Sequence, residues 1–324
     1  MILITGGLGF IGSHTARALL DLGETCVLAQ RREPGPNPLF AEEIGERVVI
    51  EQLDIADLGA LLDLGSRHQI TGVIHLAGAY RGDPISDSRD NVVGLLNIVE
   101  AAKTWGVRRI GIASTIGVYD GGEVGALQES LPLPLSAPHA IASAKKVSEI
   151  LASYLGATVG IEIYAVRIGA IWGPLGRTVS PFFAVPQLVH AAAAGNAPDL
   201  STLPGGRLPY ADEGIDLMYA PECGRALALL QLADRLEHRV YNVSGGRLTT
   251  YRELVDAISA ALPDADINIG TDFALPPGRD PQQARPRMWL DNSRLRQDTG
   301  YEPEYDTERA VTGYLAWLRA GNER

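Results

Sequence analysis

Three glycines near the start of the chain have the spacing of a phosphate-binding turn. Gly6, Gly9 and Gly12 lie between a short apolar run at residues 2–4 and an apolar helical pattern that starts at Ile11. Between a strand and a helix, such glycines permit a tight bend, close approach of a pyrophosphate and close packing of the helix on the strand. The start of the helix adds free N–H groups and a partial positive charge. The pattern predicts a dinucleotide-binding turn, and the alternative is an ordinary glycine-rich turn.

The end of the second predicted strand, residues 25–29, indicates which dinucleotide would bind. An acidic residue usually stands there and holds the ribose hydroxyls of NAD. Here Gln30 is followed by Arg31 and Arg32. Without the carboxylate a 2′-phosphate is not repelled, and two guanidinium groups can bind it with charged hydrogen bonds of about 1.5–3 kcal/mol each. We therefore expect NADP, with NAD as the alternative; the two arginines could instead be solvated loop charges.

Further apolar runs predict the other strands of a parallel sheet, at residues 48–50, 73–78 and 109–114, together with a long helix over 91–102. Small residues after the 73–78 strand would let the phosphates and ribose of a cofactor pass close by. His75 in this run is expected to be a structural hydrogen-bonding residue. Asp54 would meet the adenine edge of the dinucleotide, unless it caps a helix that starts near Asp57.

The composition is that of an ordinary globular protein. The chain has 324 residues, 46% of them hydrophobic and 21% charged, and a net charge of −11. The negative charge disfavours a nucleic-acid partner, since phosphate backbones require clustered Lys and Arg. Cys26 and Cys223 are the only cysteines; they suit a reducing cytoplasm and offer no metal-ligand spacing. No apolar run approaches the ~20 residues of a membrane span, and we expect no signal peptide before the first strand.

Several segments together resemble the extended short-chain dehydrogenase/reductase family, in its NAD-dependent epimerase/dehydratase branch. The family's order and spacing are found over almost the whole chain in TGGLGFIG, LDIAD, HLAG, NVVGLLN, ASTIGVYD, VRIGAIWGP, YNVSGGRLTTYRELVDAI and DNSRLRQDTGYEP. The resemblance implies an α/β fold, a Rossmann doubly wound parallel sheet with a smaller C-terminal substrate lobe. It implies an NAD(P)-binding domain over 1–170, rejoined by about 212–246, and a substrate lobe over 171–211 and 247–324.

The same resemblance implies a catalytic set of Ser or Thr, Tyr and Lys. In the family the Tyr exchanges a proton with the substrate oxygen, the Lys lowers the Tyr pKa and binds the nicotinamide ribose, and the Ser or Thr holds the substrate oxygen. Thr115 matches the hydroxyl position, and Lys145 matches the lysine because Glu149 fits the family's glutamate four residues later. Ile141 stands where the tyrosine should be. The cofactor-binding residues implied in this way are Gly6, Gly9, Phe10, Ile11, Gly12, Arg31, Arg32, Asp54, Ile55, Leu76, Ala77, Gly78, Asn91, Lys145 and Arg167.

The missing tyrosine raises the question of which group moves the proton. His139 follows a proline, as the family's tyrosine often does, but the six residues between it and Lys145 correspond to about 240° around a regular helix. Histidine can act as an acid or a base near neutral pH, so His139 is a catalytic candidate; the alternative is that it only begins the helix. Tyr80, Tyr119 and Tyr210 are further candidates from loops, and the sequence does not rank them.

Positions that hold the diphosphate of nucleotide sugars in many relatives differ here. The resemblance places Ala170, Ile215 and Pro277 where the family has Asn, Arg and Arg. Ile116 and Gly117 stand where dehydratases have an Asp-Glu pair. We therefore expect neither an ordinary nucleotide-sugar substrate nor sugar dehydration of that kind. Substrate contacts are expected from Tyr80, Thr115, Tyr119 and Arg279.

Arg279, with Arg285 and Arg287, would either rebuild an anion site or form a solvated basic loop. The function expected from all of this is an NAD(P)-dependent oxidoreductase or epimerase that acts on a secondary alcohol or carbonyl of a sugar or other small molecule, with a non-standard proton donor. The alternative is an NADP(H)-binding sensor or scaffold protein without turnover. The resemblance also implies a homodimer formed through the helices that contain Asn91 and Lys145.

Overall fold

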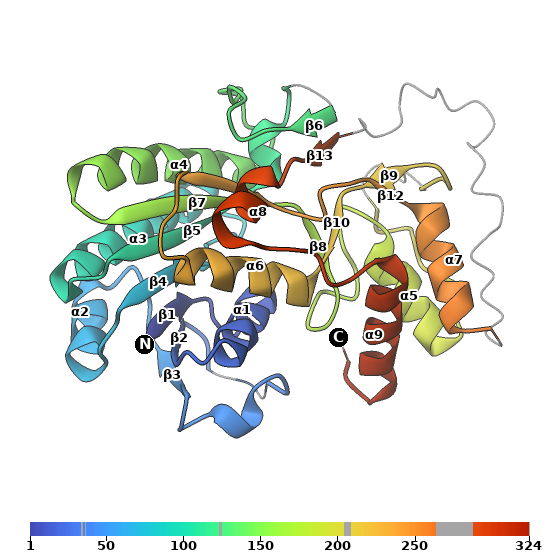
Figure 1. Ribbon diagram of the computed structural model, residues 1–324, viewed down its shortest axis with the longest axis horizontal. Helices are drawn as coiled ribbons and strands as arrows, with labels where there is room; N and C mark the ends of the chain where they lie inside the picture. Colours follow the sequence, from blue (N-terminus) through green and yellow to red (C-terminus); the bar gives the residue numbers. More distant parts are fainter. Residues whose placement is uncertain (34, 36, 123–124, 204–208, 264–287, 324) are drawn as a thin grey trace.

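The computed structural model describes residues 1–33, 35, 37–122, 125–203, 209–263 and 288–323. Among these residues a seven-stranded parallel sheet is formed by β1 (Ile2–Thr5), β2 (Cys26–Gln30), β3 (Val48–Gln52), β4 (Gly72–His75), β5 (Arg109–Thr115), β7 (Glu162–Ile168) and β11 (Val240–Val243). Their order is β11-β7-β5-β4-β1-β2-β3 (Figure 1). The chain moves outward from β1 to β2 and β3 and then returns to β4 beside β1. Ligands of such sheets bind outside the carboxyl ends of the strands at this reversal.

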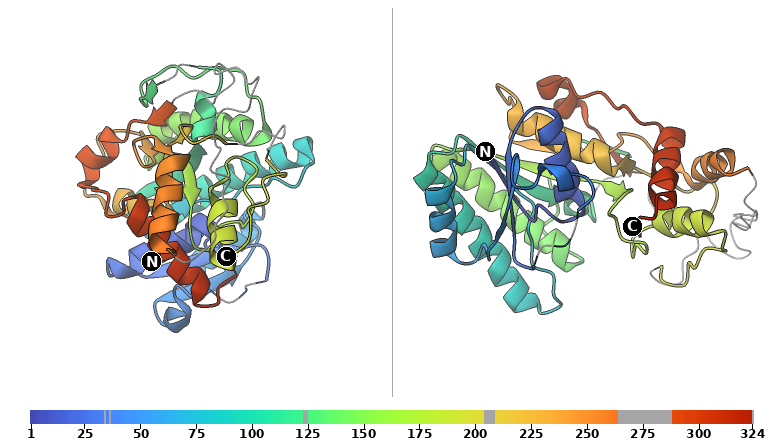
Figure 2. Two further views of the ribbon diagram at one scale, coloured as in Figure 1. Left: turned by 90° about the vertical axis from the view of Figure 1, so that its right-hand side faces the viewer. Right: turned by 90° about the horizontal axis from the view of Figure 1, so that it is seen from below.

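Helices cover both faces of the sheet (Figures 1 and 2). One face carries α2 (Leu58–Arg67), α3 (Pro84–Trp105) and α4 (Ala140–Thr158), and the other carries α1 (Phe10–Asp21) and α6 (Ala220–Leu232). The strands are apolar on both sides because both faces are buried: every residue of β1 and β4 lies in the interior. The predicted Rossmann doubly wound sheet is confirmed.

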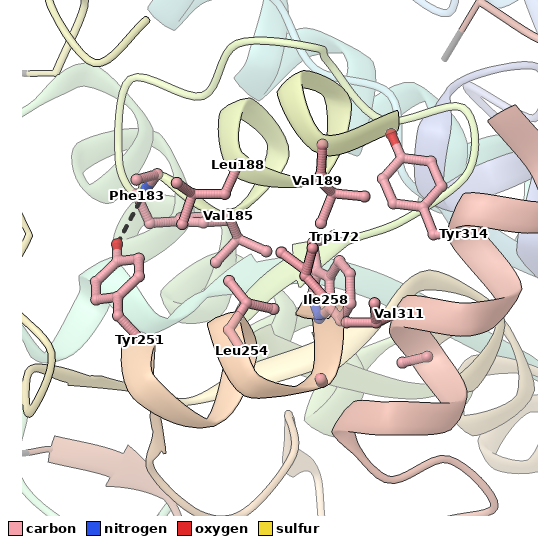
Figure 3. Packing of buried hydrophobic residues seen from close by; sticks show 14 of the residues in the cluster. Trp172, Phe183, Val185, Leu188, Val189, Tyr251, Leu254, Ile258, Val311 and Tyr314 are labelled. Carbon is pink, nitrogen blue, oxygen red and sulfur yellow. Dashed lines mark hydrogen bonds between the residues drawn. The ribbon is translucent and has the colours of Figure 1, made fainter. Parts of the chain in front are cut away.

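The smaller lobe, on the right in Figure 1, has a core of its own. It contains β8 (Ala170–Trp172), α5 (Val185–Ala194), β9 (Gly214–Ile215), β10 (Leu217–Tyr219), β12 (Thr249–Thr250), α7 (Tyr251–Ala261) and α9 (Thr307–Arg319). Figure 3 shows Leu188 of α5, Leu254 of α7 and Tyr314 of α9 converging around Trp172. Leu254 and Ile258 of α7, and Val311, Tyr314 and Leu315 of α9, recur at helical spacing, so each set forms one apolar face of its helix, and these faces meet here.

Some local boundaries differ from the sequence-based expectation. The helix predicted over 91–102 begins earlier, at Pro84, because proline at the first helical position has a suitable fixed φ. Leu295 of α8 (Ser293–Thr299) and Tyr301 pack with α6 and β11 on the sheet lobe, although the predicted boundaries place them in the substrate lobe.

Short elements complete the described chain: the 3₁₀ turns η1 (Ala41–Glu43) and η2 (Ile116–Tyr119), and the strand pair β6 (Gly125–Leu127) and β13 (Met288–Leu290).

Candidate active site

The glycine turn joins the end of β1 to the start of α1. Gly6 has φ of +69°, a left-handed conformation that side chains disfavour. A side chain at Gly12 would collide with the carbonyl oxygen of Gly6, so the helix can begin directly over the strand only without one. Gly9 is the N-cap of α1, and no side chain caps the first N–H groups there. These amides, at Phe10, Ile11 and Gly12, are therefore available to an anionic ligand.

The two arginines expected near the adenosine lie at the end of β2. Arg31 Nη1 is 3.8 Å from Asp54 Oδ2, and both side chains are nearly half exposed. Asp54 Oδ1 accepts a hydrogen bond of 3.0 Å from the Ala56 amide. Arg32 is exposed, and Gln30 donates to its carbonyl oxygen at 2.7 Å. Asp57, not Asp54, caps α2, because its Oδ1 accepts from the Ala60 amide at 3.0 Å.

The end of β4 is fixed against the end of β1. Thr5 Oγ1 hydrogen-bonds with His75 Nδ1 at 2.8 Å and accepts from the Ala77 amide at 3.2 Å. His75 is buried; burial first, and then the charge of Lys145, lowers its pKa to about 3. It is therefore neutral and structural, as expected from the sequence. Leu76, Ala77 and Gly78 follow in the segment that lies beside the glycine turn: the amide of Ala77 would be 3.2 Å from a Cβ at Gly6.

Asn91 and Ile55 shape the neighbouring loops. Asn91 on α3 accepts from the Ala79 amide at 2.8 Å and donates to the Ala79 carbonyl at 2.9 Å, so its side chain holds the loop after β4. Ile55 packs against Gly94 of the same helix, where a Cβ would lie 2.7 Å from Ile55 Cδ1. Asn91 and Ile55, both predicted to contact the cofactor, thus lie at this edge of the sheet: Asn91 holds a loop, and Ile55 packs its own loop against α3.

His139 is the N-cap of α4. Its Nδ1 accepts a hydrogen bond of 3.2 Å from the Ala142 amide, and its Nε2 lies 3.2 Å from Asp120 Oδ2. Because Nδ1 accepts, the proton is on Nε2, which donates to Asp120. Both ring nitrogens are thereby used by the protein. This arrangement matches the helix-start role that was the alternative for His139, and we do not assign it the proton transfer.

Thr115 and Lys145, unlike His139, each keep a polar group without an acceptor in the described residues. Thr115 ends β5, and its Oγ1 accepts from the Gly117 amide at 3.2 Å, which leaves the hydroxyl proton free to be donated. Lys145, on α4, is half-buried, and burial lowers the pKa of its amine to about 8. Within the part of the chain that the structure describes, no carboxylate or carbonyl hydrogen-bonds to this amine. Its electrostatic effect on His75 places it near the end of β4.

Arg167 and Tyr119 belong to a buried network instead of an open surface. Arg167 bonds Glu149 with its Nε at 3.0 Å and its Nη2 at 2.7 Å, and Ser114 donates to the same carboxylate. Arg167 Nη1 donates to the Tyr119 hydroxyl at 2.8 Å, and that hydroxyl donates to Asn242 Oδ1 at 3.0 Å. These bonds tie β5, α4, β7 and β11 together behind the site. The predicted contacts of Arg167 with cofactor and of Tyr119 with substrate therefore have no free polar group to make them.

The smaller lobe supplies few of the expected groups. Ala170 begins β8, and the side chain of Ile215 is buried in the core of this lobe. Arg279, Arg285, Arg287 and Pro277 lie outside the described residues. The structure also places a carboxylate that the sequence did not single out: Asp216, whose pKa is raised to about 6 by burial, accepts from the amides of Gly246 and Leu290. Its partners follow it by 30 and 74 residues, so no local pattern signals the role.

Across the described residues, no group of three or more His, Cys, Asp or Glu side chains could hold a metal ion. Within the same residues, no helix has the length and apolar character needed to cross a membrane.

Comparison with known proteins gives consistent matches. The sequence matches the model of the "NAD dependent epimerase/dehydratase family" over residues 2–244. Similar curated proteins include dTDP-glucose 4,6-dehydratase of Streptomyces griseus, 26% identical over 98% of this chain and 93% of that protein. UDP-glucose 4-epimerase of Neisseria gonorrhoeae is 26% identical over 98% of this chain and 97% of that protein.

Solved structures share the fold. UDP-N-acetylglucosamine 4-epimerase from Methanobrevibacter ruminantium M1, in complex with UDP-N-acetylmuramic acid, superposes with a TM-score of 0.80 at 22% identity, covering 99% of this chain and 98% of that one. The Bordetella bronchiseptica enzyme WbmG, in complex with NAD, has a TM-score of 0.74 at 21% identity, with 98% and 94% of the chains covered.

Proposed function

Because the chain belongs to the NAD dependent epimerase/dehydratase family and is an enzyme of that family, we propose that it is an NADP-dependent oxidoreductase or epimerase. Its substrate would be a secondary alcohol or carbonyl of a sugar or other small molecule. The observation that carries the proposal is the uncapped N-terminus of α1 at the end of β1, together with the free amine of Lys145, whose charge acts on His75 at the end of the neighbouring β4. An anionic coenzyme would bind to both.

Different residues on this edge would bind different parts of the coenzyme. The amides after Gly9 would bind the pyrophosphate, and Lys145 the nicotinamide ribose. Arg31 and Arg32 would bind a 2′-phosphate, which favours NADP over NAD, although Arg31 already faces Asp54. Asp54 and Ile55 would border the adenine. When bound, the nicotinamide supplies or accepts a hydride.

Thr115 would hold the reacting oxygen with its free hydroxyl proton. Lys145 would raise the local positive potential, because a partly buried cation acts more strongly than a solvated one. Ile141 leaves the usual phenol out of this arrangement. The identities of the relatives make sugar nucleotides the first probes to try. Ala170 and Ile215 offer the diphosphate no charged group, which favours substrates other than the ordinary nucleotide sugars.

The α3 and α4 helices support a homodimer. They pack side by side and expose apolar residues to solvent: Ile85 at 71%, Leu96 at 41%, Val147 at 40%, Ile150 at 64% and Tyr154 at 66%. A second copy of the chain would cover this stripe. A cytoplasmic location agrees with the free, buried thiols of Cys26 and Cys223.

Calorimetry and turnover assays test the proposal. We expect the purified chain to bind NADPH more tightly than NADH, and nicotinamide absorbance to change with a carbonyl, alcohol or sugar-nucleotide probe. Lys145→Ala and Thr115→Ala are each expected to lower kcat by about 10²–10⁴. The control is Lys103→Ala, an exposed lysine in the last turn of α3, which should change nothing. Absence of binding to either coenzyme would overturn the proposal; binding without turnover of any probe would favour a sensor or scaffold.

A further inference from the structure

The loop after β4 is held on both sides of Tyr80. Asn91 fixes Ala79 through its amide N–H and carbonyl groups, at 2.8 and 2.9 Å. The buried carboxylate of Asp87 accepts from the amides of Arg81 at 2.7 Å and Gly82 at 3.0 Å. Both anchors come from α3, which is packed on the sheet. Backbone groups on each side of Tyr80 are therefore pinned, and the position of its side chain is defined by a rigid element.

The ring of Tyr80 lies on Gly78, one of the residues expected to border the coenzyme. A Cβ at Gly78 would be 2.8 Å from Tyr80 Cε2, so the ring packs on the backbone of Gly78. The residue is 41% exposed. Its hydroxyl hydrogen-bonds to nothing among the residues that the structure describes. A half-buried phenol with a free hydroxyl on a pinned loop is available to a ligand.

Three of the other candidate positions offer no free donor. Ile141 occupies the usual tyrosine position, both nitrogens of His139 are bonded to the protein, and the Tyr119 hydroxyl lies in the buried network with Arg167. Tyr210 also makes no hydroxyl hydrogen bond among the described residues, but it lies before β9 in the smaller lobe. Tyr80 is the candidate whose loop is anchored beside Gly78 and the glycine turn.

We propose that Tyr80 is the proton donor of the reaction and that Asn91 and Asp87 are its positioning residues. The inference rests on the proposed function. The phenol would give its proton to the carbonyl oxygen of the substrate while the carbonyl carbon receives the hydride that a bound reduced nicotinamide coenzyme would supply, and the phenolate would then regain a proton from water. In the reverse direction the phenolate takes the alcohol proton. Burial, followed by the negative charge of Asp87, raises the pKa of Tyr80 to about 12, so the phenol holds its proton at neutral pH.

A spectroscopic test does not require the natural substrate. The protein is labelled with 3-fluorotyrosine, and the ¹⁹F resonance absent from Tyr80→Phe is that of Tyr80. Its pKa is measured with saturating NADP⁺ and with saturating NADPH. The oxidised nicotinamide ring is cationic and the reduced ring is neutral. A unit charge beside a phenol lowers its pKa by about 1 to 2 at the effective dielectric of a protein, so we expect the lower value with NADP⁺. Equal values in the two complexes would overturn the assignment.

Kinetics form the second arm, with UDP-glucose, UDP-galactose and dTDP-glucose as probes. For any probe that is turned over, Tyr80→Phe should lower kcat by about 10²-fold or more, with KM and the NADPH Kd little changed. Asn91→Ala should lower kcat less and shift the pH profile. Tyr154→Phe is the matched control on the outer surface of α4 and should retain wild-type kcat. An unchanged kcat in Tyr80→Phe refutes the proposal; if no probe is turned over, the ¹⁹F result decides.

Coenzyme binding and the Tyr80 resonance give separate results. If neither coenzyme binds, the proposed function fails and the Tyr80 assignment falls with it. If both coenzymes bind and the Tyr80 resonance does not distinguish them, only the Tyr80 assignment fails.

Discussion

Replacing His14 with glutamine is expected to make the protein less sensitive to acid. His14 lies on α1, one turn after the glycine turn, and it is buried. Its Nε2 is 2.8 Å from the carbonyl oxygen of Pro174, which lies in the loop after β8. Its ring packs edge to face on Phe10, with 6.1 Å between ring centres. The contact joins the glycine turn to the segment that leads into the smaller lobe.

Burial lowers the pKa of His14 from 6.5 to about 4, and the hydrogen bond to Pro174 only partly opposes this. Between these values the unfolded chain binds a proton that the folded chain does not. The stability from neutral His14 is therefore complete above pH 6.5 and is lost as pH falls toward 4. At pH 5 the loss is about 2 kcal/mol. The pKa of His75 is lowered to about 3, so protonation pressure on this residue causes a further loss of stability of about the same size at pH 5.

Urea unfolding of the wild type and of His14→Gln at pH 8 and pH 5 measures the effect. Glutamine keeps an N–H for the Pro174 carbonyl but does not titrate. The difference in unfolding free energy between the two proteins should move by about 2 kcal/mol in favour of the variant between pH 8 and pH 5. Asp216 acts in the opposite sense, since its raised pKa adds stability as pH falls, but it is common to both proteins and cancels. A difference that stays constant with pH would refute the reasoning.

Three other substitutions test separate parts of the molecule. Arg31→Ala combined with Arg32→Ala should raise the Kd of NADPH by about 10-fold or more and leave that of NADH unchanged, because charged hydrogen bonds to phosphate contribute about 1.5–3 kcal/mol each; fluorescence titration measures this, and equal losses would contradict it. Glu149→Gln should destabilise the fold by about 3–5 kcal/mol in urea unfolding, since it leaves the buried Arg167 guanidinium unpaired; a loss below about 1 kcal/mol, the range of a surface ion pair, would contradict it. Ile150→Glu should give a monomer in sedimentation that still binds NADPH, and an unchanged mass would argue against the α3–α4 dimer surface.

The fold could be predicted because its signals are local. Glycines at 6, 9 and 12 indicate a turn in which other residues would strain the backbone or collide with it. Apolar runs bounded by turns indicate strands that are buried on both faces. The sides of α7 and α9 that enter the core likewise carry apolar residues at helical spacing. These patterns depend on neighbours a few residues away, so a single sequence carries them.

The candidate site could be predicted only in part, because residue type does not show how a polar group is used. His139 was a catalytic candidate, yet a helix begins at its side chain. Asp87 and Asp216 carried no signal, since Asp216 meets partners far along the chain and Asp87 meets loop amides that the sequence left unplaced. Only the folded arrangement reveals which donors and acceptors are satisfied.

Hydrogen bonding within the described residues therefore separates two kinds of polar group at the carboxyl edge of the sheet. Arg167, Tyr119 and His139 direct their polar atoms to other parts of the chain, and their removal would first weaken the fold. Lys145, the Tyr80 hydroxyl and the first amides of α1 make no comparable bonds within those residues. A partly buried cation or phenol loses hydration without gaining a protein partner, a state that a bound ligand relieves. The groups left unsatisfied by folding are thus the ones that a coenzyme and substrate would complete.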